Sequence, residues 1–148
     1  MRYTKYSPRS LEEQDAYMWD AAEFDLLLNN FIPNRTITHL FPKYLKNGAR
    51  ILEGGCGNGS WVKYLNNQGY DCIGTDINEV ILDVAKKEKL NIMKDDILNM
   101  SFADGSFDAY LSLGVIEHWQ EGPQKAINEA FRIIKPGGYF FVSTPCNH

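Results

Sequence analysis

The chain has 148 residues, of which 44% are hydrophobic, and its formal net charge is −4. This length suits one domain with a substantial core, and the hydrophobic content excludes a disordered chain. The acidic balance argues against a nucleic-acid partner, which usually requires a basic face, and the sequence has neither an apolar run of ~18 residues nor a signal-peptide core, so we expect no membrane association.

Two helices are predicted before the first strand. Ser10-Leu11-Glu12-Glu13 is a capping box, so the first helix should begin near Leu11, continue to about Asn30 and end at Pro33. The second should cover residues 35–45, with a kink or a break at Pro42. Residues 1–48 would then form a helical cap, and its aromatic residues either form a lid over a ligand site or simply pack a helix on the sheet: Tyr3, Tyr6, Tyr17 and Trp19.

Strand and helix patterns alternate from Ala49 onward. The strand-like segments are 49–53, 70–75, 91–94, 108–113 and 139–143, and the helix-like segments are 60–68, 79–87 and 123–134. This alternation predicts an α/β, Rossmann-like, doubly wound domain over residues 49–148, with a mainly parallel sheet and helices on both faces. Ligands of such sheets bind at the carboxyl ends of the strands.

The first strand runs into a glycine-rich turn, Gly54-Gly55-Cys56-Gly57-Asn58-Gly59. Glycine permits positive φ and a close approach of a ligand to the backbone, and the N–H groups of the following helix would face that ligand. A purely structural glycine turn is the alternative. The three cysteines of the chain lack C-x-x-C spacing, so we expect neither a disulfide framework nor a metal site, and a reducing cytoplasm.

Asp76 ends the second strand and is followed by Ile77. An acid about 20 residues beyond a glycine turn can accept hydrogen bonds from both hydroxyls of a ribose, and Ile77 would lie against a purine; a helix N-cap is the alternative role of Asp76. Nicotinamide dinucleotides normally require G-x-G-x-x-G, whereas this chain has G-x-G-x-G preceded by Glu53. Glu53 would repel a pyrophosphate and suits a cationic ligand.

These segments, with three later ones, resemble the class I S-adenosylmethionine-dependent methyltransferases, most closely the small-molecule type. The first two motifs are residues 51–59 and 73–77. Residues 94–102, KDDILNMSF, are similar to the family's G-D-A-x-x-L-P-F, and residues 104–113, DGSFDAYLSL, to its D-x-S-F-D-x-V strand. Residues 134–138, IKPGG, resemble the turn before strand five, so five motifs follow in the family's order.

The resemblance implies an enzyme that binds S-adenosylmethionine, forms S-adenosylhomocysteine and methylates an unidentified small-molecule acceptor. Glu53 and the glycine turn would hold the methionine part, and Asp76 the ribose. Asp96, preferred over Asp95, would frame the adenine with Ile97. The full set of implied cofactor-binding residues is Glu53, Gly54, Gly55, Cys56, Gly57, Gly59, Asp76, Ile77, Asp96, Ile97 and Leu113.

His118 lies just beyond the fourth strand and is the candidate general base, with a loop histidine as the alternative. A non-catalytic cofactor-binding module and a nicotinamide-dependent oxidoreductase remain open as other functions. Gly54 departs from the family pattern because it replaces the usual apolar residue, and Ser101 stands where proline is common.

The family's sheet has seven strands, and this sequence stops just after the fifth. Residues 139–143 would therefore lie at a bare, apolar edge of the sheet, and such edges pair with other chains. We expect either a homodimer through this edge or a chain that is part of a longer protein.

Overall fold

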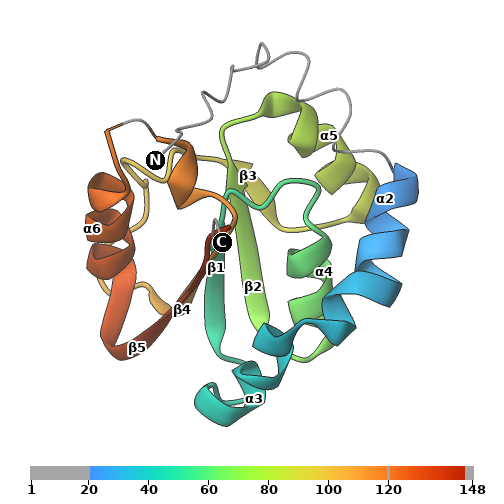
Figure 1. The fold of residues 1–148 in the computed structure, drawn as a ribbon, viewed down its shortest axis with the longest axis horizontal. Coiled ribbons are helices and arrows are strands. Elements are labelled where there is room, and N and C mark those ends of the chain that lie inside the picture. Colours follow the sequence, from blue (N-terminus) through green and yellow to red (C-terminus); the bar gives the residue numbers. More distant parts are fainter. Residues whose placement is uncertain (1–20, 120, 146–148) are drawn as a thin grey trace, which may run out of the picture.

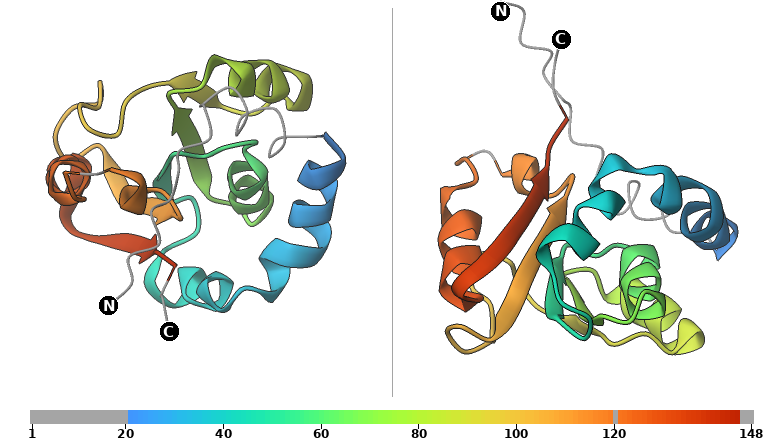
Figure 2. Two further views of the ribbon diagram at one scale, coloured as in Figure 1. Left: turned by 45° about the horizontal axis from the view of Figure 1, so that its top comes forward. Right: turned by 90° about the horizontal axis from the view of Figure 1, so that it is seen from below.

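The computed structural model describes residues 21–119 and 121–145. Its five strands form one parallel sheet in the order β3-β2-β1-β4-β5 (Figures 1 and 2). The strands are β1 (Arg50–Gly54), β2 (Asp71–Asp76), β3 (Ile92–Lys94), β4 (Phe107–Leu113) and β5 (Ile134–Ser143). The Rossmann-like fold class predicted from the sequence is thus confirmed.

Three helices flank the sheet in the way that the alternating pattern predicts. They are α4 (Ser60–Asn67), α5 (Glu79–Glu88) and α6 (Gln124–Ile133). Figure 1 shows α6 on one side of the sheet and α4 and α5 on the other. In the part of the chain that the structure describes, no helix is both long and apolar enough to cross a membrane.

The segment before β1 is more irregular than predicted. It contains α2 (Ala21–Leu26), a π-helical turn (Leu27–Phe31), two 3₁₀ turns (Ile32–Asn34 and Thr36–His39) and α3 (Phe41–Tyr44). The predicted helix over residues 35–45 is divided because Pro42 has no N–H to donate, and the N–H groups of Thr38 and Leu40 bond three residues back instead. The predicted capping box and the four lid aromatics lie outside the described residues.

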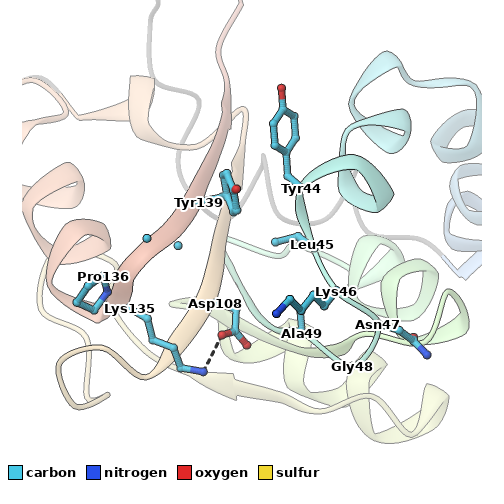
Figure 3. Close-up of a pocket in the computed structure, with 12 residues that line it drawn as sticks. Tyr44, Leu45, Lys46, Asn47, Gly48, Ala49, Asp108, Lys135, Pro136 and Tyr139 are labelled. Carbon is cyan, nitrogen blue, oxygen red and sulfur yellow. Dashed lines mark hydrogen bonds and ion pairs between the residues drawn. The ribbon is translucent and has the colours of Figure 1, made fainter.

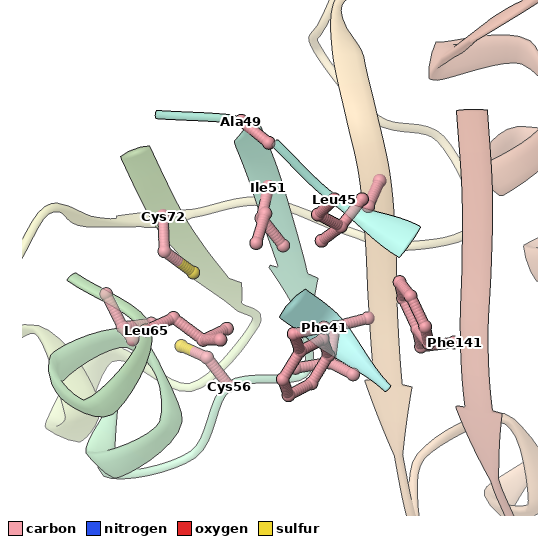
Figure 4. Close-up of a cluster of buried hydrophobic side chains, with 11 residues drawn as sticks. Phe41, Leu45, Ala49, Ile51, Cys56, Leu65, Cys72 and Phe141 are labelled. Atoms are coloured by element: carbon pink, nitrogen blue, oxygen red, sulfur yellow. The ribbon is translucent and has the colours of Figure 1, made fainter. Parts of the chain in front are cut away.

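Two hydrophobic clusters cover the two faces of the sheet. On one face, Phe41 of α3 and Leu65 of α4 pack over Ile51 of β1 (Figure 4). On the other face, Leu52 of β1 and Tyr110 of β4 pack under α6. Successive residues of β1 therefore point to opposite faces, as the pleat of a strand requires. Phe41 also ties the segment before β1 to the sheet, because its ring lies 5.1 Å from that of Phe141 on β5.

Strand β5 forms one edge of the sheet and, among the described residues, pairs only with β4. It begins five residues earlier than the predicted strand because Ile134 already pairs with Phe107. The next pair is Ala109 with Tyr139. The Lys-Pro-Gly-Gly segment between Ile134 and Tyr139 therefore forms an irregularity within the strand. The position of β5 at the edge of the sheet agrees with the edge position expected from the sequence for residues 139–143.

Candidate functional site

The glycine turn lies at the carboxyl end of β1 and folds against the end of β2. The N–H groups of Gly55 and Cys56 donate to the carbonyl oxygen of Thr75 at 2.8 and 2.9 Å. Gly55, Gly57 and Gly59 have φ values of +71°, +53° and +77°, which residues with a Cβ rarely adopt. The turn therefore needs glycine for its conformation, in addition to any need of a ligand.

Asp76 joins this turn to the end of β2. The N–H of Gly57 donates to Oδ2 and the N–H of Asn78 to Oδ1, each at 3.0 Å. A carboxylate oxygen has two lone pairs, so both oxygens keep capacity for a further donor. Asp76 thus holds the turn before α5 and does not cap the helix through the bonds seen here, and this role is compatible with the predicted binding of ribose. Ile77, beside it, is 55% exposed and offers an apolar surface at the same edge.

Glu53 is a buried carboxyl group at the end of β1, only 3% exposed. Burial raises the pKa of Glu53 well above its ordinary value, and the Asp76 carboxylate raises it further, although a hydrogen bond from the Val62 N–H lowers it. Its Oε2 atom has no hydrogen-bond partner among the described residues. A buried polar atom of this kind requires an explanation, and a cationic ligand group would supply the missing partner.

Asn58 is a buried residue of the turn that the sequence interpretation did not include. Its Oδ1 accepts hydrogen bonds from the N–H and Oγ of Ser60, at 3.1 and 2.8 Å, and so holds the start of α4. Its Nδ2 has no partner among the described residues, so this amide is a further donor at the turn. Asn side chains commonly accept from the backbone N–H two residues on in turns, and this preference could have identified Asn58.

The thiol of Cys56 has a packing role in the same turn. Burial raises the pKa of the Cys56 thiol well above its usual value, which disfavours the thiolate that a nucleophile requires. A Cβ added at Gly74 would lie 2.8 Å from the Cys56 sulfur, so glycine on β2 leaves the space that the thiol fills. Within the described residues, no group of three metal-ligating side chains could hold a metal ion.

Asp95 and Asp96 follow β3 and organise the loop after it. Asp96 Oδ1 accepts from the Leu98 N–H at 2.8 Å, and Asp95 Oδ2 accepts from the N–H and Oγ of Ser101, both at 2.9 Å. Asp96 is the more exposed of the two. Ile97 is buried in the cluster under α6, so its side chain belongs to the core. The adenine-binding role of Asp96 and Ile97 stays a prediction.

Gly54 is explained by Tyr110, which stands at the valine position of the D-x-S-F-D-x-V pattern. A Cβ added at Gly54 would overlap the hydroxyl of Tyr110 and lie 2.6 Å from its Cζ atom. Tyr110 is completely buried, and its hydroxyl has no partner among the described residues. The large residue on β4 therefore occupies the space of the side chain that Gly54 lacks.

His118 is the exposed last residue of a 3₁₀ turn (Ile116–His118) after β4. Its Nε2 is 3.1 Å from the carbonyl oxygen of Gly114, which only accepts, so Nε2 must carry the proton and only Nδ1 could act as a base.

We expect His118→Ala to change turnover more than cofactor affinity. A general base contributes about 10²-fold or more, so a smaller loss of kcat would exclude this role for His118.

A hollow of about 490 Å³ lies at the opposite end of the sheet, where the strands begin (Figure 3). Its lining includes the rings of Tyr44 and Tyr139, whose centroids are 5.3 Å apart. Lys46 and Lys135 bring positive charge to it, with Lys135 paired to Asp108 at 2.7 Å. Asp108 offsets the charge of Lys135, so the two lysines and one aspartate of this lining leave a single positive charge, in a chain whose net charge is −4.

Comparison with known proteins identifies the chain's relatives. Residues 52–142 match the methyltransferase domain family. The chain is 31% identical over 142 residues to a probable tRNA methyltransferase 9B of Bos taurus, covering 93% of this chain and 30% of that protein. It is 32% identical to an Arabidopsis thaliana tRNA (carboxymethyluridine(34)-5-O)-methyltransferase, covering 70% of this chain and 26% of the relative. The chain thus spans about a third or less of the length of these curated relatives.

A solved structure agrees with the same family. The SAM-dependent methyltransferase of Methanosarcina mazei superimposes with a TM-score of 0.64 at 28% identity, covering 73% of this chain and 56% of that one.

Two sequence-based expectations about partners are wrong. The exclusion of nucleic acid and the preference for a small-molecule acceptor are both contradicted by relatives that are named as tRNA methyltransferases. The physical reason is that net charge sums over the whole chain, whereas nucleic acid responds to the local arrangement of charge.

Proposed function

The chain belongs to the methyltransferase domain family, whose members use S-adenosylmethionine as methyl donor, and we propose that it methylates a nucleotide of tRNA. The observation that carries the cofactor assignment is the buried Glu53 carboxyl, whose Oε2 atom is unpaired beside the glycine turn. The residues present fit this cofactor, since an acid at this place matches a ligand with an ammonium and a sulfonium group.

Each residue of the site has a defined part in binding. When bound, S-adenosylmethionine supplies an activated methyl group, so the protein contributes position and electrostatics. Glu53 would accept a hydrogen bond from the ammonium group, and Asp76 would use its remaining lone pairs for the ribose hydroxyls. The glycine turn would let the ligand approach its backbone closely, and the exposed apolar surface of Ile77 would cover one face of the purine.

The tRNA acceptor rests on the relatives, two of which carry tRNA in their names at 31% and 32% identity. The experiment is transfer of a labelled methyl group from S-adenosylmethionine to total tRNA, followed by nucleoside analysis of the product. We expect one methylated nucleoside to appear only with active protein. Absence of label in tRNA, with S-adenosylhomocysteine still bound by calorimetry, would reject the acceptor and keep the cofactor.

Asp76→Ala should weaken the binding of S-adenosylhomocysteine by about tenfold to a hundredfold, the size of lost hydrogen bonds to a charged group. Because Asp76 also holds the Gly57 N–H, the melting temperature of the ligand-free variant must be measured beside its affinity. Asp71→Asn, at the start of the same strand, is the matched control and should bind like the parent chain. Equal affinity of Asp76→Ala and the parent would refute the ribose role.

A further inference from the structure

A second hollow, about 340 Å³ in volume, lies where β4 and β5 end. Its lining includes Leu113 and Gly114 of the β4 end and Ser143 of β5. The Gly114 N–H donates to the Ser143 carbonyl oxygen at 2.8 Å and holds the two strand ends together. Because all strands are parallel, these residues lie at the same end of the sheet as Glu53 and Asp76, where the strands have their carboxyl ends. The hollow therefore lies at the same end of the sheet as the proposed cofactor site, and Trp61 of its lining follows the glycine turn by two residues.

Arg35 supplies the charge of this hollow. Its backbone is fixed, since its N–H donates to the Ile32 oxygen at 3.0 Å and its carbonyl accepts from the Thr38 N–H and Oγ1 at 3.0 and 2.6 Å. Ile32 and Thr38 are both buried, so the position of the Arg35 backbone is anchored. The guanidinium is therefore carried by a fixed point of the chain.

The Arg35 guanidinium differs from the other arginines in residues 21–119 and 121–145. Arg50 pairs with Asp71, and Arg132 pairs with Asp104 and Glu129, whereas Arg35 has no ion pair among the described residues. None of the described residues that line the hollow is acidic. An exposed guanidinium without a carboxylate beside it is available for an anionic ligand, which it can bind with two hydrogen bonds.

Trp61 forms the aromatic part of the same lining. Its ring meets those of Phe41 and Tyr64 edge-on, with centroids 6.1 and 5.9 Å away, so neighbours on two sides restrict its orientation. Trp61 is half-buried and keeps surface toward the hollow. A ring held in this way suits stacking with a planar base.

We propose that this hollow is the acceptor subsite and takes a nucleotide with an anionic group bound by Arg35 and its base against Trp61. This inference rests on the proposed methyl transfer to tRNA and adds the chemical class that the subsite recognises. The anionic group has two sources in RNA, a backbone phosphate or a carboxylate carried by a modified base, and both present oxygen pairs that match a guanidinium.

The test measures dissociation constants by calorimetry on the full chain saturated with S-adenosylhomocysteine. Uridine, uridine 5′-monophosphate and carboxymethyluridine are the probes, and the variants are Arg35→Gln, Arg35→Lys and the control Lys46→Gln. Lys46 is an exposed cation at the opposite end of the strands, so its loss reports the general effect of one positive charge. Thermal unfolding of each variant checks that the fold is retained.

We expect Arg35→Gln to weaken the anionic probe that uses the site by about tenfold or more, and uridine by much less. Arg35→Lys should restore part of that affinity, and Lys46→Gln should leave it unchanged. Loss for the monophosphate alone identifies a phosphate, and loss for carboxymethyluridine alone identifies a base carboxylate. The inference is overturned if the parent binds neither anionic probe, or if Arg35→Gln binds both as the parent does.

Methylation of tRNA separates this inference from the proposed function. Probe binding that depends on Arg35, with no methylated tRNA, would remove the proposed function and leave an anion site. Equal kcat/KM on tRNA for Arg35→Gln and the parent, with equal probe binding, would remove the anion site and leave the function.

Discussion

Gly54→Ala is expected to destabilise the protein by about 3 kcal/mol, in the upper part of the range for overpacked cores. The new Cβ would overlap the Tyr110 hydroxyl and lie 2.6 Å from its Cζ atom. Tyr110 is completely buried in its cluster, so a shift of its ring displaces other core side chains. Gly54 does not have positive φ, so the cost arises from space alone. Urea unfolding of the purified variant measures the change.

Two further variants distinguish the effect of the Tyr110 hydroxyl from that of its ring. Tyr110→Phe removes a hydroxyl that has no partner among the described residues and should be nearly neutral or stabilising. Tyr110→Val leaves a cavity by itself but should accommodate Ala at position 54, giving a coupling energy of about 1 kcal/mol or more in the double-mutant cycle. Additive effects of Gly54→Ala and Tyr110→Val, or an unchanged free energy of unfolding for Gly54→Ala, would show that the missing side chain at position 54 does not compensate for the large side chain at position 110.

Most of the fold could be predicted because the chain alternates between two clear periodicities. The strands β1, β2 and β4 are short apolar runs that end in turn residues, and α4 and α5 follow them with helical spacing. The segment before β1 was harder, since the 3₁₀ turns ahead of Pro42 depend on which hydrogen bonds a missing N–H leaves available. The start of β5 was missed because its first pair, Ile134 with Phe107, is a tertiary contact across an irregular stretch.

Some residues of the candidate site could likewise be predicted from the sequence, and others could not. Glu53 and Asp76 were identifiable because each lies at the carboxyl end of a strand, and parallel strands bring such residues to the same end of the sheet. Arg35 and Trp61 carry no local signal, since they meet in the second hollow only after the segment before β1 has packed on the sheet. The size match between Gly54 and Tyr110 is likewise invisible in sequence, because the two residues belong to different strands.

Glu53→Gln should reduce cofactor affinity while it stabilises the ligand-free protein. Gln retains an acceptor for the Val62 N–H but cannot carry the negative charge that a cationic ligand requires. We expect S-adenosylhomocysteine to bind about tenfold to a hundredfold more weakly, as for a lost hydrogen bond between charged groups. Glu121→Gln removes an exposed carboxylate elsewhere and is the matched control, expected to change neither stability nor affinity.

The difference in unfolding free energy between Glu53→Gln and the parent chain should depend on pH. Burial and the Asp76 carboxylate raise the folded-state pKa of Glu53 above 4.5, so the folded chain holds its proton more tightly than the unfolded chain. The stability that this proton contributes is complete below the unfolded pKa and is lost as pH rises through the folded pKa, by up to about 1.4 kcal/mol for each pH unit. The advantage of Glu53→Gln in unfolding free energy should therefore grow with pH above the pKa of the unfolded chain.

A cationic ligand favours the carboxylate form of Glu53, so cofactor binding should release a proton. Calorimetry in buffers of different ionisation enthalpy measures this release. An advantage that shrinks as pH rises, or binding without proton release below the folded pKa, would show that Glu53 does not exchange its proton for the ligand's positive charge.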